Sequence, residues 1–162
     1  LLSMYPKCVL VSNIEILGLD YLHWTDGSEL TSVSNGQKGV IYLVDEIQLY
    51  FNSLKSKDVG EDVFVQIAQQ RKQRKHIVGT TQVFGRLAKP FREQLSAAIL
   101  CANFLGCIQY NQVLSRDCVA GETADLTLAG YTSEKHIWLH TRELYGSYDT
   151  YDLVKGGVRN DD

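Results

Sequence analysis

The chain has 162 residues, of which 44% are hydrophobic and 22% are charged, and its formal net charge is −3. This length and composition fit one globular domain with a buried core, and they exclude a disordered or fibrous chain. The slightly negative charge gives no general attraction to nucleic acid, and the only dense basic run, residues 71–76, fits the solvated end of a helix.

The first predicted element is a strand at residues 8–17, which a loop at residues 18–38 follows, with glycine-containing turn signals. The second strand is predicted at residues 40–44, a run of five apolar residues that begins after Gly39. A continuous apolar run with β-branched members is typical of a strand that is buried on both faces of a parallel sheet. We therefore predict an α/β fold with a mainly parallel sheet.

Two carboxylates, Asp45 and Glu46, follow this second strand directly. Charge at the end of a buried strand suits the carboxyl edge of a parallel sheet, where α/β folds place their ligands. In phosphoryl-transfer enzymes the first acid at such a position holds Mg²⁺, and the second can polarise the attacking water. The pattern is that of a Walker B motif, so we assign Asp45 to magnesium and Glu46 to catalysis. The structural alternative is that the acids only end the strand and cap the next helix.

A third strand is predicted at residues 75–82, with Gln82 as its last residue. Residues 48–55 and 61–75 are expected to be helical, and the basic residues at the end of the second helix complement its dipole. A strand, a helix and a parallel strand bring both strand ends to the same edge of a sheet. We therefore expect Gln82 near Asp45, where an amide can hold a water in line with a γ-phosphate.

The rest of the chain carries weaker patterns. Residues 91–96 fit a short helical turn, and the apolar residues 97–114 favour strands. Residues 134–145 fit either a strand or a helix. No stretch approaches the ~20 apolar residues of a membrane-spanning helix, because the longest candidate, residues 97–105, contains Asn103.

Cysteine and histidine residues give no sign of a metal centre. The four cysteines form no Cys-x-x-Cys pair, which favours a reducing, cytoplasmic setting. His136 and His140 are four residues apart and would suit a metal on a helix, but no partner ligands stand nearby. We therefore expect no zinc site.

Five short motifs occur in a characteristic order. They are residues 9–14, which end in Ser-Asn-Ile; the block at residues 44–48; the basic helix end before Thr80-Thr81-Gln82; residues 89–92; and residues 148–150. In this order and spacing the chain, from about residue 5 to residue 152, resembles the ATPase domain of the zonular occludens toxin family. That family includes filamentous-phage assembly ATPases and lies within the wider HerA–FtsK clade.

The resemblance implies a three-layer P-loop NTPase fold that hydrolyses ATP with Mg²⁺ as part of a homo-oligomer such as a ring. It implies coupling of hydrolysis to phage DNA handling or to virion assembly and export. The expected location is the cytoplasm at the inner face of the host membrane, with any membrane association through a region outside these residues. Ring ATPases often supply an arginine from a neighbouring subunit to the phosphoryl group, and here we favour Arg92 over Arg86 for that role.

One motif of the family is absent from this sequence. A P-loop needs Gly-x-x-x-x-Gly-Lys-Ser/Thr, and no Gly-Lys dipeptide occurs in residues 1–162. We therefore expect a single partial domain, residues 1–162, whose first strand and P-loop lie upstream and which is inactive alone. Two alternatives stay open: a non-catalytic scaffolding or interaction module with a degenerate ATPase fold, and a DNA motor of the terminase or helicase type.

Overall fold

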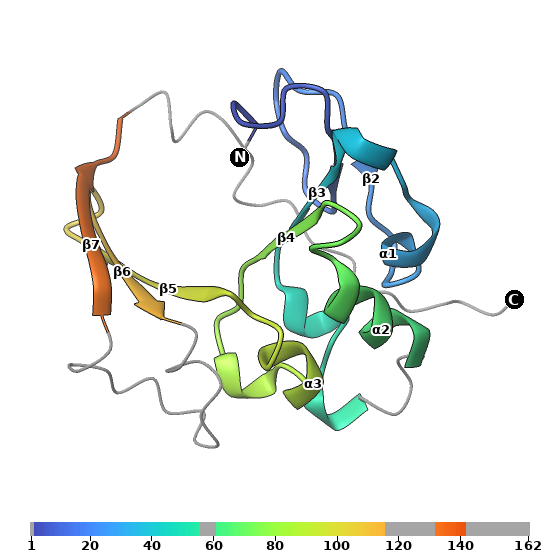
Figure 1. The fold of residues 1–162 in the computed structure, drawn as a ribbon. Helices are drawn as coiled ribbons and strands as arrows, with labels where there is room; N and C mark the ends of the chain where they lie inside the picture. The colour runs from blue at the N-terminus through green and yellow to red at the C-terminus, as the bar shows by residue number, and fades with distance from the viewer. Residues whose placement is uncertain (1, 56–60, 116–131, 142–162) are drawn as a thin grey trace, which may run out of the picture. The chain divides into compact units, whose positions relative to one another are not determined.

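The structure, a computed structural model, describes residues 2–55, 61–115 and 132–141, which fall into two compact units divided between Ala88 and Lys89. The first unit contains strands β1 (Val9–Ser12), β2 (Leu22–His23), β3 (Val40–Val44) and β4 (Lys75–Gly79), and helices α1 (Glu29–Ser32) and α2 (Glu61–Gln69) (Figure 1). The second unit contains helix α3 (Lys89–Arg92) and strands β5 (Ala97–Phe104), β6 (Ile108–Ser115) and β7 (Thr132–Leu139).

The first unit is built on a four-stranded sheet in the order β2-β1-β3-β4, and all of its strand pairs are parallel. The predicted α/β fold with a mainly parallel sheet is therefore confirmed. Tyr42 in the middle of β3 stands opposite Val11 of β1 and Ile77 of β4. Because the strands run in one direction, their carboxyl ends lie along one edge of the sheet and their amino ends along the other.

The core of the first unit lies between the sheet and the pair of helices α1 and α2, which pack against each other (Figure 1). Tyr42 is fully buried, and its hydroxyl donates to the carbonyl oxygen of Glu29 at 3.0 Å, which fixes α1 against the sheet. Val63 and Ile67 are one turn apart on α2 and both are buried. Burial of such side chains contributes about 1.5–3 kcal/mol each.

Gly39 is required at the start of β3 by a close backbone approach. Its φ is 81°, and a Cβ atom there would lie 2.8 Å from the carbonyl oxygen of Arg74. That carbonyl oxygen accepts the backbone N–H of Val40 at 3.0 Å, so the chain before β4 lies directly against the start of β3. Any residue with a side chain would push the two strands apart at this end.

The loop expected at residues 18–38 contains three short elements that the sequence did not indicate. They are the strand β2, the single-turn helix α1 and a 3₁₀ turn at Gly36–Lys38. Trp24 follows β2, is 1% exposed, and donates its backbone N–H to the carbonyl oxygen of Ser12 at 2.8 Å. Its ring lies edge-on to those of Tyr42 and Tyr50, with centroids 5.8 Å and 5.5 Å away. Tertiary packing of one tryptophan, rather than a local pattern, therefore holds β2 on the sheet.

The second unit has its own sheet, in the order β5-β6-β7, with antiparallel pairing throughout. Residues 97–114, which were expected to favour strands, supply β5 and most of β6, and they pair in this sheet rather than in the parallel one. Leu105 and Gly106 both have positive φ, at 54° and 71°, and Cys107 donates its N–H to Phe104 at 3.2 Å. This is the geometry of a type I′ turn, which folds β5 back onto β6.

The undecided segment at residues 134–145 begins in a strand, since β7 ends at Leu139. Within the described residues, no helix is long and apolar enough to cross a membrane.

Candidate functional site

Polar residues from three neighbouring strands meet at the carboxyl edge of the parallel sheet. Asn13 follows β1, Asp45 and Glu46 follow β3, and Thr80 follows β4. Two backbone bonds continue the sheet past its formal end, because Thr80 donates to the carbonyl oxygen of Val44 at 3.1 Å and accepts from Ile47 at 3.0 Å. We call Asn13, Asp45, Glu46, Thr80 and Gln82 the acidic-edge cluster.

The hydroxyl of Thr80 joins the two acids. Its Oγ1 atom donates to the Asp45 carboxylate oxygen Oδ1 and accepts the backbone N–H of Glu46 at 3.1 Å. Asp45 and Glu46 are both half-buried, whereas Thr80 is exposed. Thr80 therefore fixes the direction of the Asp45 carboxylate from the neighbouring strand. The sequence analysis quoted Thr80 only as part of a motif and gave it no role.

Glu46 is held by two amide side chains. Its carboxylate oxygen Oε1 accepts from Gln82 Nε2 at 2.6 Å, and Oε2 accepts from Gln48 Nε2. Its backbone is left-handed, with φ 52° and ψ 44°, a conformation that is uncommon outside glycine and costs about 1–3 kcal/mol at an ordinary residue. The turn at Glu46 aims the side chain at the end of β4, so Gln82 contacts Glu46 directly, at the same edge as Asp45.

Asn13 fixes the backbone of the first acid. Its side-chain amide donates to the carbonyl oxygen of Asp45 and accepts the N–H of Asp45, both at 2.8 Å. Asn13 is 8% exposed and also donates to the hydroxyl of Tyr50 at 3.4 Å. Burial raises the pKa of Tyr50, which this hydrogen bond lowers in part, so the phenol stays neutral at ordinary pH.

Gln48 was not singled out by the sequence beyond its place in the second motif. It is 6% exposed, and its Oε1 atom has no hydrogen-bond partner among the described residues. Its Nε2 atom is the donor to Glu46. An amide buried at that depth with one atom unpaired is costly, which indicates that its orientation is set by the bond to Glu46.

No cation of the described residues balances the charge of the acidic-edge cluster. Within the described part of the chain, the side chains of Asp45 and Glu46 make hydrogen bonds only to neutral donors, and neither forms an ion pair. A carboxylate and a threonine hydroxyl are hard oxygen donors that suit Mg²⁺. No group of three or more His, Cys, Asp or Glu residues gathers anywhere in the described residues. The donor set of the acidic-edge cluster therefore fits a hard divalent cation.

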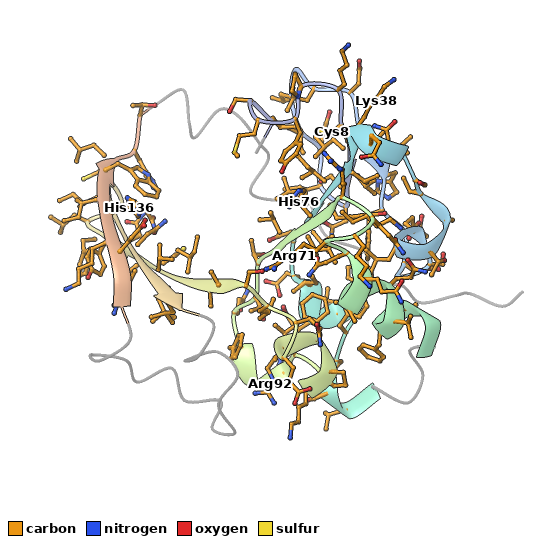
Figure 2. The ribbon with its side chains drawn as sticks, viewed as in Figure 1. Cys8, Lys38, Arg71, His76, Arg92 and His136 are labelled. Carbon is orange, nitrogen blue, oxygen red and sulfur yellow. The ribbon has the colours of Figure 1, made fainter. Side chains whose placement is uncertain are left out.

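The two candidate arginines lie outside the acidic-edge cluster. Arg86 is exposed at the end of a 3₁₀ turn in the first unit. Arg92 is the last residue of α3 in the second unit and is partly buried (Figure 2).

The metal site considered for His136 and His140 required a helix, which would place both side chains on one face. His136 lies in β7 instead, and residues four apart along a strand are about 13 Å apart.

Comparison with known proteins adds a likeness of fold. No protein-family model matches this chain, and no curated protein sequence matches it. Its structure is similar to the crystal structure of the N-terminal domain of zonular occludens toxin from Neisseria meningitidis, with a TM-score of 0.62 and 15% sequence identity. The match covers 88% of this chain and 80% of that one. The expected likeness of fold is therefore confirmed: residues of this chain adopt an α/β fold like that of the zonular occludens toxin N-terminal domain.

Proposed function

We propose that the acidic-edge cluster is the magnesium-binding and water-positioning half of an ATP-hydrolysing site. The observation that carries the proposal is the joining of Asp45 and Glu46, at the end of β3, to Thr80 and Gln82. Both follow the adjacent parallel strand β4, which ends at Gly79 rather than at Gln82 as predicted. Ligands of open α/β folds lie outside the carboxyl ends of the strands. The fold likeness to the zonular occludens toxin domain supports the same assignment.

Each residue has a distinct role in this proposal. Asp45, oriented by Thr80, holds Mg²⁺, and the ion supplies neutralisation of the phosphate charge that develops during transfer. Glu46 accepts a hydrogen bond from the attacking water and orients it. Gln82 already contacts Glu46, so its amide is placed to share that water. Asn13 acts through the backbone of Asp45 and is a positioning residue.

The phosphate-binding half of the site must come from outside residues 1–162 in this proposal. Phosphates in such sites are held by backbone N–H groups and a lysine of a Gly-Lys-Ser/Thr loop, and this sequence has no Gly-Lys dipeptide. A segment of the same polypeptide or a partner would supply that loop. We accordingly expect the chain of residues 1–162 to give no saturable heat in calorimetric titration with ATP at about millimolar concentration, since phosphate contacts dominate nucleotide affinity.

The wider role that we propose is ATP hydrolysis in a homo-oligomer, coupled to phage DNA handling or to virion assembly and export at the inner face of the host membrane. In such an assembly Arg92 of one subunit would contact the phosphoryl group bound by its neighbour, because a guanidinium stays ionised and forks onto phosphate oxygens. One rival function is a scaffolding module that has kept this fold without hydrolysis, because a fold does not fix a function.

The test uses the polypeptide that includes its phosphate-binding loop and measures magnesium-dependent phosphate release. Asp45→Ala should abolish metal-dependent turnover, and Glu46→Gln should retain bound ATP while turnover falls by about 100-fold or more, the usual contribution of a positioned base. The matched controls are Asp20→Ala and Glu15→Gln, which change exposed carboxylates that do not belong to the acidic-edge cluster.

Near-normal turnover in Glu46→Gln would remove the role assigned to Glu46. Absence of hydrolysis in the wild-type polypeptide, with nucleotide bound or not, would favour the scaffolding module. A nuclease activity encoded on the same polypeptide would instead favour the terminase type of DNA motor.

A further inference from the structure

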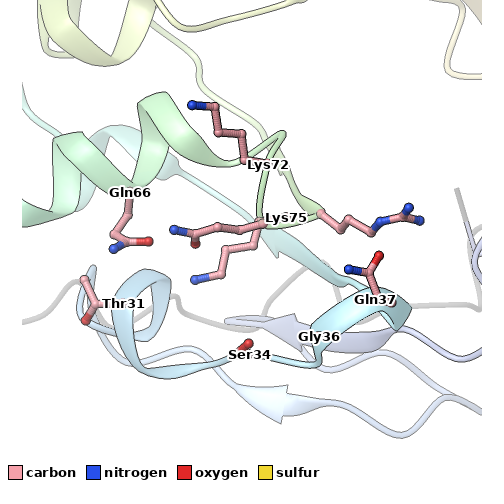
Figure 3. A pocket seen from close by; sticks show the side chains of 9 residues that line it. Thr31, Ser34, Gly36, Gln37, Gln66, Lys72 and Lys75 are labelled. Atoms are coloured by element: carbon pink, nitrogen blue, oxygen red, sulfur yellow. The ribbon is translucent and has the colours of Figure 1, made fainter.

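A polar hollow lies at the edge of the parallel sheet opposite the acidic-edge cluster. It has a volume of about 360 Å³ and is lined by α1, α2, the turn before β3 and the turn before β4. Because β4 runs for five residues between this hollow and Thr80, the two regions are separated by roughly 16 Å of strand. The acidic-edge cluster therefore does not include this hollow, which is shown in Figure 3.

The lining carries three cations and no carboxylate. The cations are Lys72, Arg74 and Lys75, and the other lining residues are Thr31, Ser34, Gly36, Gln37, Gln66 and Gln73. None of the three cations forms an ion pair within the described part of the chain.

Lys75 is the most informative of the three. It is 5% exposed, and its ammonium group donates to the carbonyl oxygen of Leu30, a bond that uses one of three donor hydrogens. Figure 3 shows its side chain reaching from the start of β4 towards the segment that holds Thr31 and Ser34. Burial lowers the pKa of Lys75, with no acid to oppose the effect. A buried cation without a counter-charge is costly, and an anion in the hollow would relieve that cost.

The backbone brings Arg74 to the same place. Arg74 has a left-handed φ of 53°, and its carbonyl oxygen accepts the N–H of Val40, so the turn before β4 is tied to the start of β3. Neither the guanidinium of Arg74 nor the hydroxyl of Ser34 has a hydrogen-bond partner among the described residues. Both are therefore available to an external acceptor.

We propose that this hollow binds a phosphate group. A phosphate offers several acceptor oxygens and up to two negative charges, which match an ammonium, a forked guanidinium and a hydroxyl better than a single carboxylate does. The phosphate can be a free anion or part of the backbone of a nucleic-acid strand, and two probes distinguish these sources.

The test uses the chain of residues 1–162 and two probes at low, constant ionic strength. The first probe is inorganic phosphate, followed by amide shifts of Ser34 and Gln37 in nuclear magnetic resonance spectra. The second is a dye-labelled thymidine oligonucleotide of about ten nucleotides, followed by fluorescence anisotropy. The informative variant is Arg74→Asn, because asparagine tolerates the left-handed conformation. Arg71→Asn is its matched control, since Arg71 belongs to the same basic run but does not line the hollow.

Arg74→Asn should weaken binding about tenfold or more, the loss expected for one charged hydrogen bond, while Arg71→Asn should change it less than about threefold. A selective loss with phosphate alone identifies a small-anion site, and a selective loss with the oligonucleotide identifies a backbone phosphate. Absence of saturable binding of both probes, or equal weakening by the two substitutions, would overturn the proposal. Asp45→Ala should leave binding unchanged, so the result is separate from the proposed hydrolysis.

Discussion

Gly79→Ala should destabilise the parallel sheet at the end that carries the acidic-edge cluster. A Cβ atom at Gly79 would lie 2.7 Å from Cδ1 and 3.0 Å from Cβ of Ile47, a side chain that is itself buried. At Gly27 the nearest atoms to such a Cβ are ring carbons of Phe51 at 3.5 Å, an ordinary contact. Neither glycine is left-handed. Gly27→Ala is therefore a control with the same chemical change and no clash.

The expected difference in the free energy of unfolding between the two variants follows from two opposing effects. Replacing glycine by alanine reduces the entropy of the unfolded chain and stabilises by about 0.4–1 kcal/mol at either site. Forcing a methyl group into a packed region costs about 1–3 kcal/mol, and only Gly79→Ala incurs this cost. Because the first term is common to both variants, Gly79→Ala should be less stable than Gly27→Ala by about 1–3 kcal/mol.

Urea unfolding followed by tryptophan fluorescence measures this difference. Trp24 is 1% exposed and reports on the first unit, so the experiment is best done with Trp138→Phe, which removes the only other tryptophan, a 42% exposed residue of the second unit. Ile47→Val removes the Cδ1 atom at 2.7 Å and should recover part of the loss. Equal unfolding midpoints for Gly79→Ala and Gly27→Ala would refute the packing argument.

Three further predictions address other parts of the molecule. Tyr42→Phe should lower the free energy of unfolding by about 0.5–1.5 kcal/mol, since it removes the hydrogen bond from the Tyr42 hydroxyl to the carbonyl oxygen of Glu29, which keeps only the N–H of Val33; an unchanged free energy of unfolding would contradict this. Lys75→Met should flatten the pH dependence of stability. The pKa of Lys75 is lowered on folding, so the unfolded state binds more protons between that lowered pKa and 10.5, and wild-type stability should rise with pH across that window. Urea midpoints at about pH 7 and pH 10 test this, and parallel curves for both proteins would refute it. In the proposed oligomer, a mixture of Arg92→Ala subunits and Glu46→Gln subunits should recover ATP hydrolysis that neither variant has alone. Arg86→Ala subunits should hydrolyse ATP without mixing. Full activity of Arg92→Ala subunits by themselves would contradict a role of Arg92 across the subunit boundary.

The sequence was informative wherever local chemistry decides the structure. Residues 40–44 form a five-residue apolar run, which rarely forms anything but a buried strand. The strand, and the position of the two acids at its end, could therefore be predicted. Gln82 could be predicted near the same edge because parallel strands joined by a helix end on the same side. The prediction needed no side-chain geometry.

The remaining features depend on contacts between distant residues. β2 has two residues, too few for any periodic pattern, and is held by the packing of Trp24. The hydrogen bond from Thr80 to Asp45 depends on the register in which β3 pairs with β4, and no spacing in the sequence specifies that register. In the second unit, the turn at Leu105 and Gly106 folds β5 back onto β6. Leu105 occupies a left-handed position there, whereas an asparagine or glycine at that position would have predicted the turn.

The role of the Asn13 amide makes the acidic-edge cluster sensitive to spontaneous deamidation at this residue. Its donor and acceptor match the N–H and carbonyl of Asp45 as a peptide group would, and an aspartate at this position cannot do the same. Spontaneous deamidation would place a carboxylate oxygen 2.8 Å from the carbonyl oxygen of Asp45, where the amide donor now lies. That replaces a hydrogen bond by a repulsive contact in a buried position and adds a third negative charge beside two that form no ion pair within the described residues. Hydrolysis of one neutral amide, which takes up water and releases ammonia, would thus weaken the contact between the residues that follow β1 and β3, with Asp45 and Glu46 chemically intact.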